Sequence, residues 1–188
     1  HRTNLPQVRI SPSDAVTRRM AASFAAPVVL TSPLRDGSLR AVAAAKGTPV
    51  LLYEAGEGLR FDEMAVRAGV AGILRVMHVE DMLPAKGIAP SRRQSHVCSS
   101  STWLRAPVGG LLRTFRAEGE TVKEGDALAT VSDPFGKTEE DITAPHDGIL
   151  IGRAILPVVN EGDAVFHLAK LLPKAVADTV EDMITQLE

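Results

Sequence analysis

The chain has 188 residues, a length that fits one large domain or two small ones. Its formal net charge is −2 and it has no basic arm and no basic patch interleaved with aromatic residues, so we expect no nucleic-acid partner. No apolar run approaches the ~20 residues that a membrane span needs, and the single cysteine suits a reducing, cytoplasmic compartment.

Residues 1–83 are predicted to be an α/β region. Ser13 or Asp14 is expected to cap a helix that ends near Ala25, and residues 28–30 are predicted to be a short buried strand. The apolar positions expected on one face of this helix are Val16, Met20 and Phe24. A helix followed directly by a buried strand is typical of an α/β sheet.

A second helix and another buried strand are predicted next. Ser38 is expected to cap this helix and Gly47 to close it. The residues expected to point inward are Leu39, Val42 and Ala43. Residues 49–53 form a continuous apolar run of the kind found in parallel sheets.

The longest helix is predicted over 61–78, where Gly69 and Gly72 indicate close packing against the sheet. Its apolar positions include Phe61, Met64, Ala68 and Ile73. Residues 84–101 lack any apolar period and are rich in proline, glycine and serine. We interpret them as a linker and as the natural boundary between two domains.

Residues 106–131 and 144–169 are two imperfect copies of one sequence. The first copy contains A-P-V-G-G-L-L and V-K-E-G-D-A, and the second contains A-P-H-D-G-I-L and V-N-E-G-D-A. Each copy has a proline where a strand can begin and a turn glycine that can take a positive φ. We therefore predict that the copies interlock over 102–170 as a small all-β barrel with pseudo-twofold symmetry. A last helix is predicted over 171–188.

A repeat of this kind, joined at a hairpin, is typical of biotinyl and lipoyl carrier domains, which have a barrel-sandwich hybrid fold. Lys137 lies between the copies, close to the spacing at which such a domain carries its cofactor. Its surroundings, D-P-F-G-K-T, match neither the paired methionines of biotinyl hairpins nor the acidic and small neighbours of lipoyl hairpins. A solvated turn lysine is the favoured interpretation, and cofactor attachment at Lys137 is the alternative.

The segment 47–58 reads G-T-P-V-L-L-Y-E-A-G-E-G and places Glu54 where the predicted strand ends. Ligands bind outside the carboxyl ends of strands in open α/β sheets, and a carboxylate held there is well placed for proton transfer. Taken alone, a glutamate that caps a helix or joins a salt bridge explains the segment better.

Four stretches together resemble the succinylglutamate desuccinylase/aspartoacylase family of zinc-dependent hydrolases. They are R-T-N-L-P-Q-V-R at 2–9, D-G-S-L-R at 36–40, Y-E-A-G-E at 53–57, and the two-copy region with its D-P-F-G and A-P-H-D-G-I-L elements. The resemblance covers nearly the whole chain except the linker and the last helix. It implies a carboxypeptidase-like α/β fold with a parallel or mixed sheet, followed by the small β-barrel.

The resemblance also implies roles for three residues. Glu54, in an E-x-G motif, would act as the general base toward water and then as the acid toward the leaving amine. In the family an arginine upstream of this strand helps to hold the substrate carboxylate, and Arg40 is the nearest candidate; an exposed helix arginine is the alternative. Asn4 is a further candidate for substrate binding. The implied reaction is deacylation of an N-acyl amino acid or a related small N-acyl compound.

The zinc ligands that the resemblance implies are largely missing from the chain. The family takes them from H-G-x-E and D-L-H stretches on the N-terminal side of R-T-N-L-P, and no H-G-x-E occurs here. His1 is the candidate ligand next to the matching segment. His96 and Cys98 would supply two ligands where a structural zinc needs four, and the other histidines stand singly. We therefore expect a C-terminal part of a metallohydrolase that is inactive by itself.

Three functions are left open by the sequence. The first is a Zn²⁺-dependent amide hydrolase that acts on a small N-acyl substrate. The second is a biotinyl- or lipoyl-type carrier with Lys137 as its attachment site. The third is a non-catalytic barrel that mediates oligomer contacts or shields the mouth of an active site. This third role is compatible with the first, and assembly into homo-oligomers is left open with it.

Overall fold

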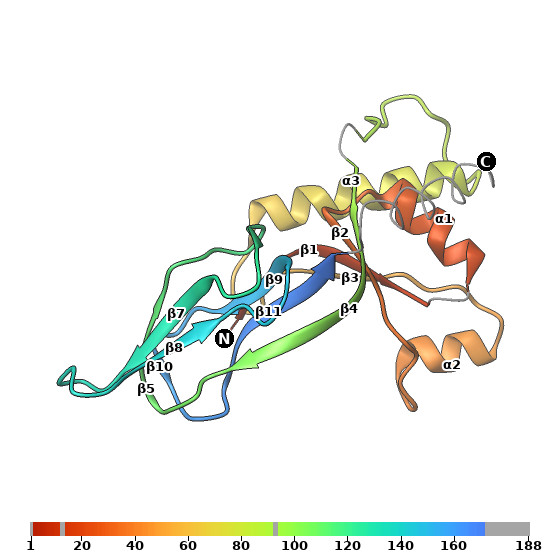
Figure 1. The fold of residues 1–188 in the computed structure, drawn as a ribbon. Coiled ribbons are helices and arrows are strands. Elements are labelled where there is room, and N and C mark those ends of the chain that lie inside the picture. The colour runs from red at the N-terminus through yellow and green to blue at the C-terminus, as the bar shows by residue number, and fades with distance from the viewer. Residues whose placement is uncertain (1, 12–13, 92–93, 172–188) are drawn as a thin grey trace. The chain divides into compact units, whose positions relative to one another are not determined.

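The computed structural model describes residues 2–11, 14–91 and 94–171 (Figure 1). These residues form two compact units. The α/β unit comprises the described residues of 6–55 and 62–100, and the strand unit comprises residues 2–5, 56–61 and 101–171. The helix expected over 171–188 lies outside the described residues, apart from Leu171.

The α/β unit is built on strands in the order β3-β1-β2-β4. Their bounds are β1 Arg2–Ile10, β2 Val28–Thr31, β3 Leu52–Glu57 and β4 His96–Arg105. β2 runs parallel to both β1 and β4, with Val8 opposite Val29 and Leu30 opposite Cys98. These three strands are therefore parallel to one another, whereas of the three only β2 was predicted as a strand.

Three helices accompany the strands of this unit: α1 Ala15–Phe24, α2 Leu39–Ala45 and α3 Glu63–Val79. The capping side chains are Asp14, Ser38 and Asp62, which accept hydrogen bonds from backbone N–H groups of the first turn. The predicted helix starts at Asp14 and Ser38 are confirmed. Gly47 follows the end of α2 with a φ of 71°, as expected of a terminating glycine. None of the described helices is long and apolar enough to cross a membrane.

The helices α1 and α3 pack against each other and cover one face of the strands (Figure 1). Val8 and Ile10 of β1 and Val29 of β2 are buried in the core on this face. Because side chains alternate along a strand, Arg9 points to the opposite face. We call the two sides the helix-covered face and the second face.

Small residues of α3 make the close contacts of this core. Among the buried residues of α3 are Ala65, Gly69 and Gly72, whereas Phe61, Met64 and Ile73 are exposed. A Cβ added to Gly72 would overlap the ring of Phe24, and one added to Gly69 would lie 2.9 Å from Tyr53 Cε1. The glycines thus permit close packing, as predicted, against an aromatic ring of α1 as well as one of β3.

The other two helices also differ from the predicted pattern. In α1, Phe24 is buried as predicted, but Val16 is 37% exposed and the polar Thr17 is buried. None of the residues of α2 is buried, and Leu39 is 79% exposed. The side chains of α1 that lie in the core are those of the small Ala21 and of Phe24.

The segment 84–101, expected to be a linker, ends in strand β4. Residues 84–91 contain no helix or strand, but pairing with β2 begins at His96. Cys98 is fully buried and Val97 packs on the core, whereas Ser99 and Ser100 are exposed. The linker interpretation is therefore wrong from His96 onward. The strand could not be recognised in the sequence because its few apolar residues show no clear period.

The strand unit contains the two sequence copies. Its further strands are β5 Gly110–Thr114, β6 Thr121–Val122, β7 Ala127–Ser132, β8 Glu139–Thr143, β9 Gly148–Ala154, β10 Val158–Val159 and β11 Ala164–Leu171. One set of strands has the order β10-β5-β7-β8 and the other the order β6-β9-β11-β4. Since β4 to β7 in one copy correspond to β8 to β11 in the other, the two orders are equivalent.

The copies interlock through reciprocal pairs, as the sequence predicts. Val122 of the first copy lies opposite Gly148 of the second, and the equivalent Val159 lies opposite Gly110. The turns are joined in the same way, by hydrogen bonds from Gly125 N–H to the Ala144 carbonyl (2.8 Å) and from Gly162 N–H to the Ala106 carbonyl (2.9 Å). The buried core of this unit includes Leu128, Val131, Leu150, Val165, Phe166 and Leu168.

Candidate active site

Glu54 lies within strand β3 rather than at its end. The strand predicted over 49–53 begins at Leu52 and continues to Glu57, so the expected loop after Glu54 is wrong. β3 lies beside β1 in the sheet, and Tyr53 packs in the core of the helix-covered face. Alternation then places Glu54 on the second face, the face to which Arg9 also points.

Arg9 and Glu54 form an ion pair on this second face. Nη2 of Arg9 lies 2.9 Å from Oε2 of Glu54 and donates a hydrogen bond to it. The Arg9 side chain is 17% exposed and that of Glu54 is 36% exposed. The carboxylate is therefore held at one oxygen by a shielded guanidinium and remains accessible to a small molecule.

Arg40 belongs to the same group of charges. It lies at the start of α2, where Nη1 donates to Ser32 Oγ (2.8 Å) and Nη2 donates to the Ser32 carbonyl (3.1 Å). Partial burial, and secondly the positive charge of Arg9, lower the pKa of Arg40 from its usual value. Arg40 is thus a half-buried arginine at the start of α2 that is anchored to Ser32.

We refer to the Arg9–Glu54 ion pair, together with Arg40, whose pKa the charge of Arg9 helps to lower, as the Arg9–Glu54–Arg40 cluster. Arg9 is the penultimate residue of β1, and Ser32, which anchors Arg40, directly follows β2. The cluster therefore lies at the carboxyl ends of two parallel strands, where α/β sheets bind ligands. Guanidinium groups bind small anionic molecules, and the carboxylate of Glu54 can carry a proton beside such a molecule.

Arg9 was not identified from the sequence, although its stretch was. It is the last residue of R-T-N-L-P-Q-V-R, between the buried Val8 and Ile10. That alternation of apolar, charged and apolar residues could have predicted a strand with Arg9 on the face away from the core. The pairing of Arg9 with Glu54 could not have been predicted, because the sequence of a strand does not determine which strand lies next to it in the sheet.

The other two candidate residues are Asn4 and His1. Asn4 belongs to the strand unit, where it is paired with Gly152 of β9. A Cβ added to Gly152 would lie 2.8 Å from Asn4 Oδ1, so the asparagine side chain packs over this glycine. His1 lies outside the described residues.

The described residues do not provide a zinc site. Residues 2–11, 14–91 and 94–171 contain no group of three or more histidine, cysteine, aspartate or glutamate side chains that could hold a metal ion. His96 and Cys98 lie on β4, where the cysteine is buried and the histidine is exposed. A zinc ion needs at least three protein ligands, so the residues present do not fit this metal.

The remaining histidines have local partners. His78 Nδ1 lies 3.0 Å from the Leu83 carbonyl. His167 is buried, lies 2.8 Å from Ser101 Oγ through Nε2, and stacks on Trp103 at 4.3 Å between ring centroids. These contacts account for the histidines as structural residues.

Cys98 gives a direct test of the packing around β4. Burial raises the pKa of its thiol to about 12, so the thiol is neutral and shielded at pH 8. We expect Ellman's reagent to leave Cys98 unmodified in the folded protein at pH 8 and to modify it fully in denaturant. Rapid reaction of one thiol equivalent without denaturant would contradict the position of β4.

Lys137 lies in the turn between β7 and β8. Asp133 holds this turn by accepting hydrogen bonds from the hydroxyl and N–H of Thr138 and from the N–H groups of Phe135 and Lys137. The bonds to Thr138 and Phe135 lower the pKa of Asp133 from its usual value. Lys137 is exposed, with Nζ 6.0 Å from the ring centroid of Phe135. The contacts are those of a solvated lysine on a well-braced turn.

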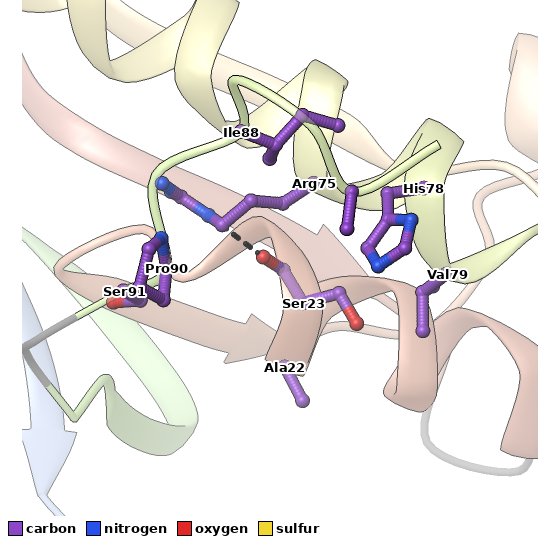
Figure 2. A pocket seen from close by; sticks show the side chains of 9 residues that line it. Ala22, Ser23, Arg75, His78, Val79, Ile88, Pro90 and Ser91 are labelled. Carbon is purple, nitrogen blue, oxygen red and sulfur yellow. Dashed lines mark hydrogen bonds between the residues drawn. The ribbon is translucent and has the colours of Figure 1, made fainter. Parts of the chain in front are cut away.

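A cavity of about 350 Å³ lies on the helix side of the α/β unit. Figure 2 shows its lining by residues of α1, α3 and the segment after α3. Arg75 donates to the carbonyls of Ser23 (3.0 Å) and Phe24 (2.5 Å), and His78 is bonded to a carbonyl of its own turn. The two ionisable groups of the cavity are thus engaged with backbone, and the cavity lies on the face away from Glu54.

Comparison with known proteins gave matches to solved structures only. No family model matches the chain, and no curated protein sequence matches it. Succinylglutamate desuccinylase/aspartoacylase from Rhodobacter sphaeroides is 20% identical with a TM-score of 0.78, over 91% of this chain and 55% of that one. The apo structure of the ectoine utilization protein EutE (DoeB) from Ruegeria pomeroyi is 19% identical with a TM-score of 0.78, over 89% and 56%.

A third structure, from Shewanella amazonensis and described as a putative member of the same family, is 19% identical with a TM-score of 0.74, over 89% of this chain and 52% of that one. The chain thus spans about half the length of the structures that it matches. It has the fold of that part of succinylglutamate desuccinylase/aspartoacylase structures, which confirms the resemblance at the level of the fold.

Proposed function

We propose that this chain is the C-terminal part of a hydrolase of the succinylglutamate desuccinylase/aspartoacylase type, and that the whole hydrolase removes the acyl group from an N-acyl amino acid or a related small N-acyl compound. The observation that carries the proposal is the Arg9–Glu54–Arg40 cluster at the carboxyl ends of two parallel strands. The fold shared with solved structures of this family supports it.

Glu54 would carry the proton in this reaction. Its carboxylate takes a proton from the water that attacks the acyl carbonyl, and returns that proton to the amine nitrogen as the C–N bond breaks. The products are a free carboxylate and a free amine. Arg40, anchored on Ser32, would bind the carboxylate of the substrate through its guanidinium.

The zinc dependence of the proposed reaction rests on the family resemblance alone. The described residues do not fit a zinc ion, so we derive no step of the reaction through a metal. We further infer that the strand unit is a barrel of the biotinyl/lipoyl type, supported by its reciprocal pairs. Its role would be to mediate oligomer contacts or to shield the mouth of the active site, and the braced hairpin around Lys137 gives no support to a carrier function.

The proposed function is tested by measuring the amine released from a panel of substrates by the natural protein. The panel contains N-acetyl and N-succinyl amino acids, the same compounds with the carboxylate converted to a methyl ester, and an unmodified dipeptide. We expect release of the free amino acid from at least one N-acyl substrate, and a much lower kcat/KM for its methyl ester. Hydrolysis of the dipeptide alone, or of none of the compounds, would contradict the proposal.

A further inference from the structure

The carboxylate of Glu54 is held at only one of its two oxygens. Arg9 Nη2 donates to Oε2 at 2.9 Å. Within the described part of the chain, Oε1 has no hydrogen-bond partner, and more than a third of the side chain is exposed. One oxygen is therefore fixed by a charged donor, and the other is directed neither to the backbone nor to a second cation.

A second ion pair of the same unit shows how a purely structural pair differs. Arg19 Nη2 lies 2.8 Å from Oε1 and 2.9 Å from Oε2 of Glu80, and Nε lies 3.3 Å from Oε1. This arginine engages both carboxylate oxygens and so ties α1 to the end of α3. Arg9 makes a one-point contact although a two-point contact is the stronger arrangement for arginine and carboxylate.

The rest of the Arg9 guanidinium is also incompletely bonded. Its Nε is buried and finds no hydrogen-bond acceptor among the described residues. Buried donors without an acceptor are rare in native proteins and call for an explanation. The position of Arg9 therefore does not give its guanidinium the largest number of hydrogen bonds. It does place Nη2 in contact with Glu54.

The charges of Arg9, Glu54 and Arg40 have different roles in the proposed site. Arg9 and Arg40 lie close enough that the charge of Arg9 contributes to lowering the pKa of Arg40, after the effect of burial. Glu54 offsets the charge of Arg9, which leaves the charge of Arg40 available for an anionic group of a substrate.

We propose that Arg9 is a positioning residue for Glu54: it fixes Oε2 and so presents Oε1 as the oxygen that takes the proton from water and returns it to the leaving amine. This inference rests on the proposed function and adds to it a residue and an atom. It predicts that Arg9 affects turnover through Glu54 and does not contribute to substrate affinity.

The test compares three single variants of the natural protein with the best substrate of the panel. Arg9→Met, which keeps the length of the side chain and removes its charge and donors, is expected to lower kcat by about 10- to 100-fold with little change in KM. Arg9→Lys, which keeps a charged donor, should recover much of the loss. Arg19→Met breaks the other ion pair and should leave kcat unchanged, and circular dichroism checks that each variant is folded.

A double variant separates positioning from direct substrate binding. If Arg9 acts through Glu54, adding Arg9→Met to Glu54→Gln causes no further loss of kcat, because the two changes affect one function. A persistent loss in the double variant, a rise in KM as the main effect, or an equal loss in Arg19→Met would overturn the inference while leaving the proposed function intact. If Glu54→Gln itself retains full turnover, both the proposed function and the inference fail.

Discussion

Replacing Glu54 with glutamine is expected to lower the kcat of N-acyl hydrolysis by about 10²- to 10⁴-fold, the usual contribution of a positioned proton carrier. Glutamine keeps the size of the side chain and can still contact Arg9, but its amide cannot take a proton from water. The loss should appear equally in kcat and in kcat/KM, because the proton transfer stabilises the transition state and not the bound substrate. Steady-state kinetics with a fixed substrate measure both constants.

Glu57→Gln is the matched control for this prediction. Glu57 lies three residues further along β3, beyond Gly56 with its positive φ, and it pairs with Arg60 at 3.2 Å instead of with Arg9. The control makes the same chemical change on the same strand and should leave kcat within error of the unmodified protein. Equal effects of the two variants would show that loss of Glu54 acts through the stability of β3, and the assignment of proton transfer to Glu54 would be withdrawn.

Gly110→Ala and Gly148→Ala are each expected to destabilise the strand unit by about 3 kcal/mol, at the upper end of the usual cost of overpacking. A Cβ at Gly110 would overlap the carbonyl oxygen of Ser132, and one at Gly148 would overlap the carbonyl oxygen of Ala169. Both obstacles are backbone atoms of a paired strand, which cannot rotate away as a side chain can. Because the two glycines are equivalent in the repeat, their effects should be similar.

The measurement is urea unfolding followed by the fluorescence of Trp103, the single tryptophan of the chain, which lies in the strand unit. Gly109→Ala is the control, because its Cβ would meet its nearest neighbours at 3.6 Å, an ordinary contact distance. We expect its unfolding midpoint to move far less than those of the other two variants. A midpoint for Gly148→Ala that matches Gly109→Ala would mean that β9 and β11 are not paired in the register described here.

The features that could be predicted from the sequence are those with a local or repeated signal. The caps at Asp14 and Ser38 are side-chain effects within one turn, and the structure places both helices where these caps predict. The repeat predicted interlocked halves because equivalent turns and strand starts recur at one spacing, and the reciprocal pairs of Val122 and Val159 confirm this.

The features that could not be predicted depend on partners distant in the chain. β4 is a strand because it pairs with β2, and the serine run in its own sequence does not predict a strand. The buried positions of α3 include two glycines because the rings of Phe24 and Tyr53 lie against them. Glu54 could be singled out by its motif, but its contact with Arg9 arises from two strands whose order in the sheet is set by the whole unit.

The reciprocal pairing of the strand unit has a consequence for how such a unit can arise. In each half a short strand, β6 or β10, pairs at the sheet edge with a strand of the other half, and the two pairings are equivalent. A polypeptide that contained one half alone would have both the short strand and the strand edge with which it pairs. Two identical copies would then complete each other as an isologous, strand-swapped homodimer. The present unit has the form of such a dimer after fusion of its two subunits into one chain.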